Sequence, residues 1–358
     1  MSSFGINVFD FGAVGDGVAD DTAAIQAAIN FAAERGGGKI LFPYTKGGYR
    51  IASPGIEEYE GKPVRAQLII PPGYTHNIEL VGEMPCSLLY TYSARTPEMG
   101  NPTRFGTLRT YNTRLVSDWE PPEEHDPTAR PWSILSAPEG TLLVGKFSVA
   151  HFSITNLEFR VAFNHDKMYP TGGAVNLQNV SRINIQDCQF CLSDQIADTV
   201  IGKELLHNPC HVAGLIASAD QNDANILRNV AVQGFRYGLV CGEHICAEHL
   251  YIHNCEEGIT FHDCSHLSVI NFMVAQHNTV ILSTTRENLF GMAKGPCNVK
   301  VGAVNFECGV GGLPKVNQLK YGVYDPDGRL HGSLMWHKPW GKQEFPVVCS
   351  EEFKITQF

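Results

Sequence analysis

The chain has 358 residues, of which 43% are hydrophobic and 18% charged, and its formal net charge is −10 at pH 7. This composition excludes a disordered chain and a coiled coil. The negative charge argues against nucleic acid as a partner, because nucleic acid requires a basic face, and no apolar run approaches the roughly 20 residues of a membrane span.

The N-terminal segment is expected to form a strand followed by one short helix. Residues 6–11 alternate like a strand, and a glycine-rich turn follows. Asp20 and Asp21 are candidates for the N-cap of a helix. This helix runs to about Glu34, because apolar residues recur at helical spacing: Ile25, Ala28, Ile29 and Ala32. Three glycines end it, and residues 39–43 predict the next strand, so we expect the helix to cover one end of a solenoid.

Further along the chain, one pattern of short apolar segments recurs. Its copies begin at Val230, Leu250 and Phe272, which are 20 and 22 residues apart. Such offsets match one coil of a parallel β-helix. The alternation places these three residues in one interior stack, and a second stack is expected to hold Val232, Ile252 and Val274.

Two segments interrupt the regular pattern. Residues 84–130 are rich in Pro, Thr, Arg and Tyr, and residues 195–211 break the coil spacing, so both are predicted to be long excursions. After Pro314 the pattern weakens. We therefore expect a single domain over 1–358, made of an N-terminal cap at 1–50, coils at about 51–313 and a C-terminal cap at about 314–358.

A family resemblance is visible at the N-terminus. Residues 8–29 read VFDFGAVGDGVADDTAAIQAAI, and residues 37–43 read GGKILFP. This segment resembles the pectin-lyase-like superfamily, in the pectate-lyase-type form that polygalacturonases and phage tailspikes share. The resemblance implies an all-β fold, a right-handed parallel β-helix with a short N-terminal capping α-helix. It also implies a carbohydrate-active protein, commonly a trimer.

The chain departs from the polygalacturonase pattern in its active site. The Asn-Thr-Asp, Asp-Asp, Gly-His-Gly and Arg-Ile-Lys motifs of that branch are missing from the coils. Asp20 and Asp21 belong to the cap and cannot replace the catalytic pair. No family site can be carried over, so the catalytic residues must be sought in the coils themselves.

Aligning the coils suggests a candidate carboxylate pair. When Val240, Thr260 and Leu282 are aligned as equivalent positions, Glu243 and Asp263 also become equivalent positions on neighbouring coils. Strands of neighbouring coils are about 4.8 Å apart. Such a pair suits a retaining glycosidase, in which the carboxyl groups are about 5–5.5 Å apart. Asp220, two coils from Asp263, would instead give the wider inverting separation. Acidic residues are also common in solvated turns, so a purely structural role stays open.

Other polar residues surround this predicted pair. Substrate-binding candidates on the same turns are His244, His262, Arg286 and Asp223. Asp194, beside the second excursion, and Asp198, within it, are second-choice carboxylates.

No metal site or cofactor is predicted. His249 and His253 are four residues apart in a strand pattern. They would then point to the same side about 13 Å apart, too far to share an ion. Calcium held by Asp220, Asp223 and Asp263 stays open, since calcium prefers oxygen ligands.

Three functions compete on these grounds. The first is a glycoside hydrolase that cleaves a poly- or oligosaccharide with paired carboxylates. The second is a polysaccharide lyase on a uronate-containing glycan, with His244, His262 and Arg286 in its site; the acidic net charge places it second. The third is a non-catalytic, trimeric, tailspike-like binding or structural protein.

The cysteines and the N-terminus bear on location. Eleven Cys cannot all pair within one chain, so most are expected to be small buried residues of a reduced compartment. The first residues lack the pattern of a signal peptide. The sequence as given predicts a cytoplasmic protein, or a secreted or phage-associated one if it is part of a longer chain. We also expect a homo-oligomer, with a trimer favoured, and a poly- or oligosaccharide as the binding partner.

Overall fold

The computed structural model describes residues 5–52, 56–59, 62–71, 73–84, 113–117, 129–136, 149–161, 171–177, 180–192, 213–217, 224–253, 255–261, 264–276, 278–284, 295–307, 319–337 and 344–357.

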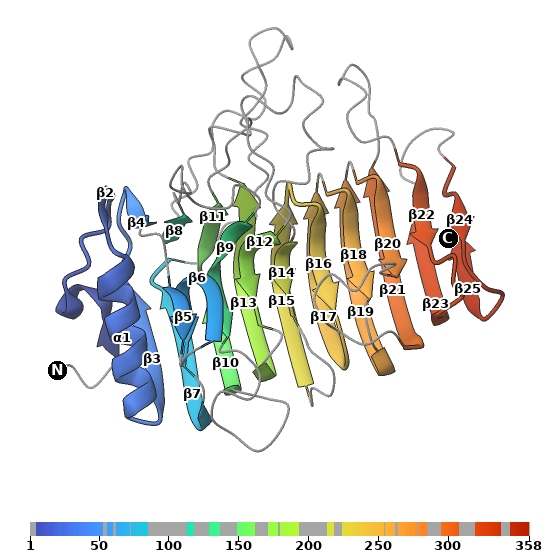
Figure 1. The fold of residues 1–358 in the computed structure, drawn as a ribbon. Helices are drawn as coiled ribbons and strands as arrows, with labels where there is room; N and C mark the ends of the chain where they lie inside the picture. The colour runs from blue at the N-terminus through green and yellow to red at the C-terminus, as the bar shows by residue number, and fades with distance from the viewer. Residues whose placement is uncertain are drawn as a thin grey trace, which may run out of the picture.

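The described strands lie side by side in two long sheets, with the N- and C-terminal ends of the chain at opposite ends of the stack (Figure 1). The main path of the 15-stranded sheet has eleven strands in this spatial order: β1 (Ile6–Asn7), β3 (Gly37–Phe42), β7 (Gly73–Gly82), β10 (Val149–Thr155), β13 (Val180–Leu192), β15 (Ala224–Gln233), β17 (Ile245–His253), β19 (Cys264–Gln276), β21 (Cys297–Glu307), β23 (Leu330–His337) and β25 (Phe353–Gln357). Four more strands form a branch that joins this path at β13: β11 (Glu158–Val161), β8 (Arg114–Ser117), β4 (Gly48–Ile51) and β2 (Asp16–Asp20).

The second sheet has ten strands. They are β24 (Val347–Val348), β22 (Tyr321–Tyr324), β20 (Val280–Thr284), β18 (Glu257–Phe261), β16 (Tyr237–Cys241), β14 (Ala213–Ile216), β12 (Thr171–Asn176), β9 (Ala129–Ser136), β6 (Lys62–Ile70) and β5 (Ile56–Tyr59). All pairs are parallel except β5 with β6. The predicted right-handed parallel β-helix is confirmed.

The chain bends at a left-handed residue within β13, β15 and β17 and between β10 and β11, which gives these coils three sides. The bend residues Asn156, Asp187, Asn229 and His249 have φ between 51° and 59°, the left-handed region that Asn and Asp tolerate best. The Asn229 amide donates to the Asp187 carboxylate at 2.9 Å, and its oxygen lies 3.0 Å from His249 Nδ1. On each of these coils, we call the strand residues before the left-handed residue the pre-bend face and the strand residues after it the post-bend face.

The bend corrects one expectation about the histidines. His249 lies at the bend itself, and His253 lies beyond it on the post-bend face. They therefore do not share one straight strand, as the sequence pattern predicted, because the left-handed residue turns the chain between them.

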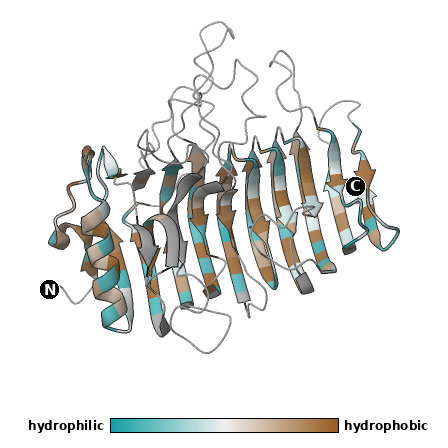
Figure 2. Cartoon of the chain, in the orientation of Figure 1, coloured by the Kyte–Doolittle hydropathy of each residue, from teal (hydrophilic) through white to brown (hydrophobic). Residues whose placement is uncertain are grey.

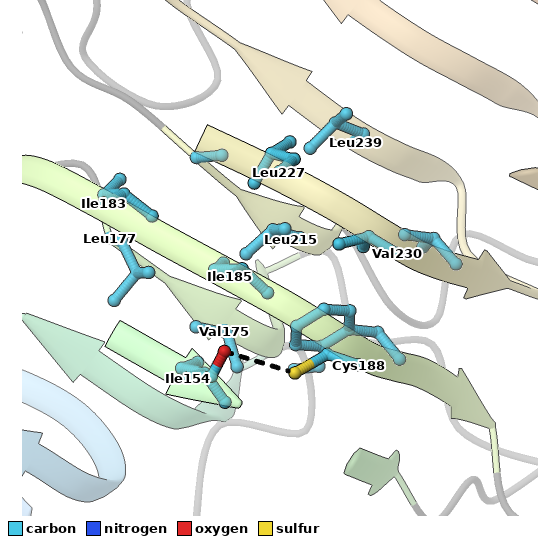
Figure 3. Close-up of a cluster of buried hydrophobic side chains, with 14 of the residues drawn as sticks. Ile154, Val175, Leu177, Ile183, Ile185, Cys188, Leu215, Leu227, Val230 and Leu239 are labelled. Carbon is cyan, nitrogen blue, oxygen red and sulfur yellow. Dashed lines mark hydrogen bonds between the residues drawn. The ribbon is translucent and has the colours of Figure 1, made fainter. Parts of the chain in front are cut away.

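Apolar side chains from all three faces fill the interior of the coils. Figure 3 shows residues of neighbouring coils meeting there, among them Ile154, Ile185, Leu215 and Val230. Cys188 belongs to the same cluster and donates to the Ile154 carbonyl at 3.5 Å. Hydrophobic and hydrophilic residues alternate along the strands, as Figure 2 shows.

The structure corrects the two interior stacks by one residue in the third coil. Leu250 pairs with Met273, not Phe272, and Ile252 pairs with Ala275, not Val274. The coil is therefore 23 residues long at this point, since 273 − 250 = 23. The run from Phe272 to Ala275 is apolar at every position, so hydrophobic alternation could not fix its register.

The N-terminal helix forms as expected at Thr22–Glu34 and is labelled α1. Its apolar stripe is fully buried, and it contacts β3, β6 and β7 at the end of the solenoid. Asp21 does not cap it; its carboxylate accepts instead from the Val14 and Gly15 amides, at 2.6 and 3.0 Å. No helix within the described ranges has the length and apolar character to cross a membrane.

The predicted strand at 6–11 is only partly correct. Strand β1 ends at Asn7, and the 3-10 helix η1 occupies Val8–Phe11. The Asn7 side chain accepts from the Phe9 amide at 2.9 Å and so starts this helical turn.

The coil pairing reaches into two regions that the sequence pattern left irregular. Strand β8, within 84–130, pairs with β4 and β11, whereas the excursion at 195–211 lies outside the described residues. Strands β22 to β25 extend both sheets beyond residue 313. There the Trp336 ring stacks on Phe345 at 4.9 Å. The division into caps and coils stays a prediction.

Candidate functional site

Glycines position the outward side chains of the ten-stranded sheet. Gly238 and Gly258 are the second residues of β16 and β18. A Cβ on Gly238 would lie 2.6 Å from the Gly258 carbonyl oxygen, and one on Gly258 would lie 2.9 Å from that of Ile281. Only glycine fits this close approach. Because the third residue of each strand also lies in the core, the first and fourth residues share the outer side.

On β18 this arrangement brings Glu257 and Thr260 together. The Thr260 hydroxyl donates to Glu257 Oε2 at 3.3 Å. Ser283, on the neighbouring strand β20, donates to the same oxygen. The two hydroxyls lie 3.0 Å apart, and both residues are buried. One carboxyl group is therefore held by two hydroxyls from adjacent coils.

The surroundings of Glu257 raise its pKa. Burial is the largest cause, because it disfavours the charged form. The hydrogen bond from Ser283 opposes the shift, the charge of Glu256 adds to it, and Thr260 and Arg236 lower it in turn. The net result is a carboxyl group that keeps its proton to higher pH than an exposed glutamate.

An ion pair lies on the turn beside this carboxyl. Arg236 Nε is 3.6 Å from Glu256 Oε2, and its guanidinium lies 5.2 Å from the Tyr237 ring centre. Tyr237 pairs in register with Glu257 on the neighbouring coil. The carboxylate next to Glu257 in the chain, that of Glu256, is therefore paired with the guanidinium of Arg236.

Two tyrosines continue the same outward rows on β22. Tyr321 pairs with Val280, which pairs with Glu257. Tyr324 pairs with Ser283. The two rings are 4.6 Å apart and partly exposed. We name the whole set the outward cluster: Tyr237, Glu257, Thr260, Ser283, Tyr321 and Tyr324.

A second polar row lies across the turn on the post-bend face. His253 and Gln276 pair in register, and both are buried. Tyr251, two residues before His253, is outward and partly exposed. His253 precedes Glu257 by four residues, so this row and the outward cluster flank one corner of the solenoid.

Of the site residues predicted from the sequence, the structure describes Glu243 and His244. Both lie on the turn between β16 and β17, and both accept from Asn225 through main-chain oxygens, at 3.1 Å. This turn follows β16, whereas Glu257 begins β18. The structure therefore does not bring Glu243 beside Glu257.

The other predicted residues lie outside the described ranges: Asp194, Asp198, Asp220, Asp223, His262, Asp263 and Arg286. The pairing of Glu243 with Asp263 stays a prediction. The alignment behind it is correct for Val240 with Thr260, but Thr260 pairs with Ser283 and not with Leu282. The predicted alignment at Leu282 is therefore displaced by one residue, because the coil is longer than its pattern indicates; the predicted row through Arg286 lies outside the described residues.

Sequence reasoning missed Glu257, Ser283 and both tyrosines, although a signal was present. The strands read Tyr-Gly-Leu-Val, Glu-Gly-Ile-Thr and Tyr-Gly-Val-Tyr from residues 237, 257 and 321. The residue before each glycine and the residue two after it are the outward positions. Within the described part of the chain, no group of three His, Cys, Asp or Glu residues is placed to hold a metal ion.

Comparison with known proteins agrees with this architecture. Residues 5–63 match the family model described as Rhamnogalacturonase A/epimerase, pectate lyase-like. The same segment contains the cap and the first coil strands of a parallel β-helix. Over residues 5–63 the chain is similar to this pectate lyase-like family. The match covers residues 5–63, and the chemistry of the chain depends on its own outward residues.

Curated relatives match the chain over a short stretch. Mannuronan C5-epimerase AlgE5 of Azotobacter vinelandii is 58% identical over 55 residues, 15% of this chain and 5% of that protein. Alginate lyase 7 of the same organism is 54% identical over 55 residues, 15% of this chain and 6% of that protein. The solved A-module of the Azotobacter vinelandii epimerase AlgE6 is 14% identical, covers 98% of this chain and 99% of its own, and has a TM-score of 0.36.

Proposed function

We propose that the protein is a carbohydrate-active enzyme that cleaves a glycosidic bond, with Glu257 as the proton donor. The observation that supports this role is the raised pKa of Glu257 on an outward, hydroxyl-lined position. Glycosidic cleavage needs one carboxyl group that is still protonated when the leaving oxygen departs. Glu257 meets that requirement among the described residues.

The neighbours of Glu257 have distinct roles in this proposal. Thr260 and Ser283 fix the orientation of the carboxyl group, so that its proton faces the bound sugar. The reaction also needs an ionised carboxylate as nucleophile or base. Glu256, paired with Arg236, is one candidate, and the predicted pair of Glu243 and Asp263 supplies the others.

A panel of neutral and uronic glycans tests the proposal. The purified protein is incubated with each glycan, and reducing ends and unsaturated products are followed separately. New reducing ends without unsaturation are expected, and Glu257→Gln is expected to lower the rate about 100-fold or more. Glu248→Gln is the matched control, because Glu248 lies on the pre-bend face and pairs with Arg228. Full activity in Glu257→Gln would exclude Glu257 as the acid.

A second candidate is an enzyme that removes a proton beside a uronate carboxyl, as a lyase or an epimerase. Two observations favour it: the printed activities of the relatives, and the neighbouring positions of Tyr251 and His253 on β17, where a partly exposed phenol and a buried imidazole would supply an acid and a base. Unsaturated products would identify the lyase. Solvent deuterium entering the sugar without chain cleavage would identify the epimerase.

Binding without any reaction would support the third alternative, a tailspike-like glycan-binding protein. Phage association and a trimeric state belong to that alternative. Sedimentation of the purified protein in the same buffer measures the oligomeric state directly.

A further inference from the structure

A serine and a histidine that the proposed function does not use lie together on β10. Phe152 and Ile154 point into the core, so His151 and Ser153 occupy successive outward positions on the pre-bend face. The Ser153 hydroxyl lies 3.4 Å from His151 Nε2. A hydroxyl within reach of an imidazole is the arrangement that activates a serine as nucleophile, and the contact is often looser than about 3.2 Å without substrate.

His151 is suited to accept the serine proton. Burial lowers its pKa, and the charge of Arg182 on β13 lowers it further, whereas Glu79 on β7 raises it. The imidazole is therefore mostly neutral at pH 7, and with its own proton on Nδ1 it accepts at Nε2. A further charged group, Lys39 on β3, lies 3.1 Å from the Glu79 carboxylate.

The neighbouring strands place polar side chains on both sides of Ser153. Glu79 pairs with it in register on β7, and Asn184 does so on β13. Arg182 pairs with His151 in the adjoining row. Neighbouring strands are about 4.8 Å apart, so a carboxylate flanks the pair on one side and amide and guanidinium donors on the other. A carboxylate stabilises an imidazolium, and such donors stabilise an oxyanion, as these charges form in acyl transfer.

From this arrangement we infer that Ser153 is the nucleophile of a second catalytic site, on the 15-stranded sheet and separate from Glu257, that hydrolyses short-chain carboxylic esters. Ser153 is 4% exposed, and its short side chain has longer ones at all the adjoining outward positions, so only a small acyl group such as acetyl fits. The attachment of that ester to a saccharide rests on the proposed function, whereas the serine chemistry does not.

The reaction balances with water as the second substrate. The Ser153 oxygen bonds to the ester carbonyl carbon while its proton moves to His151 Nε2. The bond from that carbon to the alcohol oxygen then breaks, and the alcohol leaves with the proton from His151. Water attacks the acyl-serine and gives its proton to His151, and the serine oxygen takes this proton back as the carboxylic acid departs.

Covalent labelling of the unaltered protein tests the nucleophile directly. A fluorophosphonate reacts with activated serines, and peptide mass analysis identifies the labelled residue. Labelling is expected at Ser153 and is expected to quicken between pH 5 and pH 7, as His151 loses its proton. His151→Gln is expected to slow it about 100-fold. Labels at other residues with none at Ser153 would mean that the pair is a surface hydrogen bond only and would overturn the site.

Hydrolysis of p-nitrophenyl acetate measures turnover. Ser153→Ala and His151→Gln are each expected to lower kcat/KM about 100-fold or more. Ser333→Ala is the matched control, because Ser333 lies in the same outward row and also follows a histidine by two residues. There His331 pairs with Glu352 instead, so this variant is expected to keep the full rate. A melting curve of each variant checks that it is folded, and equal rates in folded Ser153→Ala and the unaltered protein would overturn the site.

Acetylated xylan and acetylated mannan separate this site from the proposed function. Release of acetate that is lost in Ser153→Ala supports a saccharide ester as the substrate, even where the glycan chain stays intact. Hydrolysis of p-nitrophenyl acetate without release of acetate from either polymer supports the serine chemistry and overturns its assignment to these saccharides. Chain cleavage that persists in Ser153→Ala belongs to the proposed function and supports two separate sites.

Discussion

The hydroxyl groups of Thr260 and Ser283, on neighbouring coils, lie 3.0 Å apart and both contact the same oxygen of Glu257. The residues come from strands whose chain positions differ by 23, so one coil of the solenoid creates the contact. Each hydroxyl has one proton to donate. A protonated Glu257 adds a third proton to these three groups, whereas the charged form has none to donate although the side chain is partly buried.

Glu257 is expected to make the protein less stable as pH rises. Its pKa is raised in the folded state, so the folded chain binds more protons than the unfolded chain between the usual glutamate value of about 4.3 and the raised value. The free energy of unfolding therefore falls across that window. Glu257→Gln is expected to remove this fall, which urea titrations between pH 4 and pH 8 measure. Glu248→Gln serves as the comparison, because burial is not the dominant influence on the Glu248 pKa. Equal pH slopes for the unaltered protein and Glu257→Gln would contradict the assignment.

Ser283→Ala is expected to shift the pH dependence of activity. The Ser283 hydrogen bond lowers the pKa of Glu257, so its removal raises that pKa further. Activity on a cleaved glycan should then persist to higher pH, although its maximum falls because the carboxyl group is less well oriented. Rates measured from pH 4 to pH 9 test this shift. Ser283→Thr keeps a hydroxyl and is the matched control; an unchanged alkaline limb in Ser283→Ala would show that the bond does not tune the acid.

Asn229 is expected to stabilise the bends through two separable effects. Its side chain bonds Asp187 and His249, and its backbone has φ 51°. Asn229→Ala loses both effects, for about 2 kcal/mol or more. Asn229→Gly relieves the backbone strain and loses only the hydrogen bonds, so it is expected to be the more stable of the two. Chemical denaturation measures both. A glycine variant no better than the alanine variant would mean that strain at this bend is negligible.

The buried cysteines are expected to resist thiol reagents. Burial raises the pKa of Cys188 and of Cys255 to about 12, and the thiolate is the reactive form. Cys246 is exposed. Brief alkylation at pH 8 followed by peptide mass analysis is expected to label Cys246 well before the other two. Full labelling of Cys188 and Cys255 is expected only in denaturant, and their early labelling in the folded protein would contradict their burial.

The fold could be predicted from local patterns because they repeat. The N-terminal segment that ends in α1 and the recurrent apolar pieces each indicate a capped β-helix, since every coil buries the same alternating positions. The same periodicity predicted that most cysteines are buried in the interior of the coils. It also predicted that Val240 and Thr260 occupy equivalent positions on neighbouring coils.

The site depended on tertiary register, which local patterns leave open. Glu257 and Ser283 are far apart in sequence and become neighbours only because β18 and β20 pair with an offset of 23 residues. An apolar run such as Phe272–Ala275 is compatible with either register. The sequence pattern therefore aligned Leu250 with Phe272, one residue before its partner Met273 in the structure. The sequence by itself determined that this chain winds into a parallel β-helix. The pairing of the coils decided which carboxyl group lies partly buried beside two hydroxyls, because burial and hydrogen bonding depend on residues that meet only across strands.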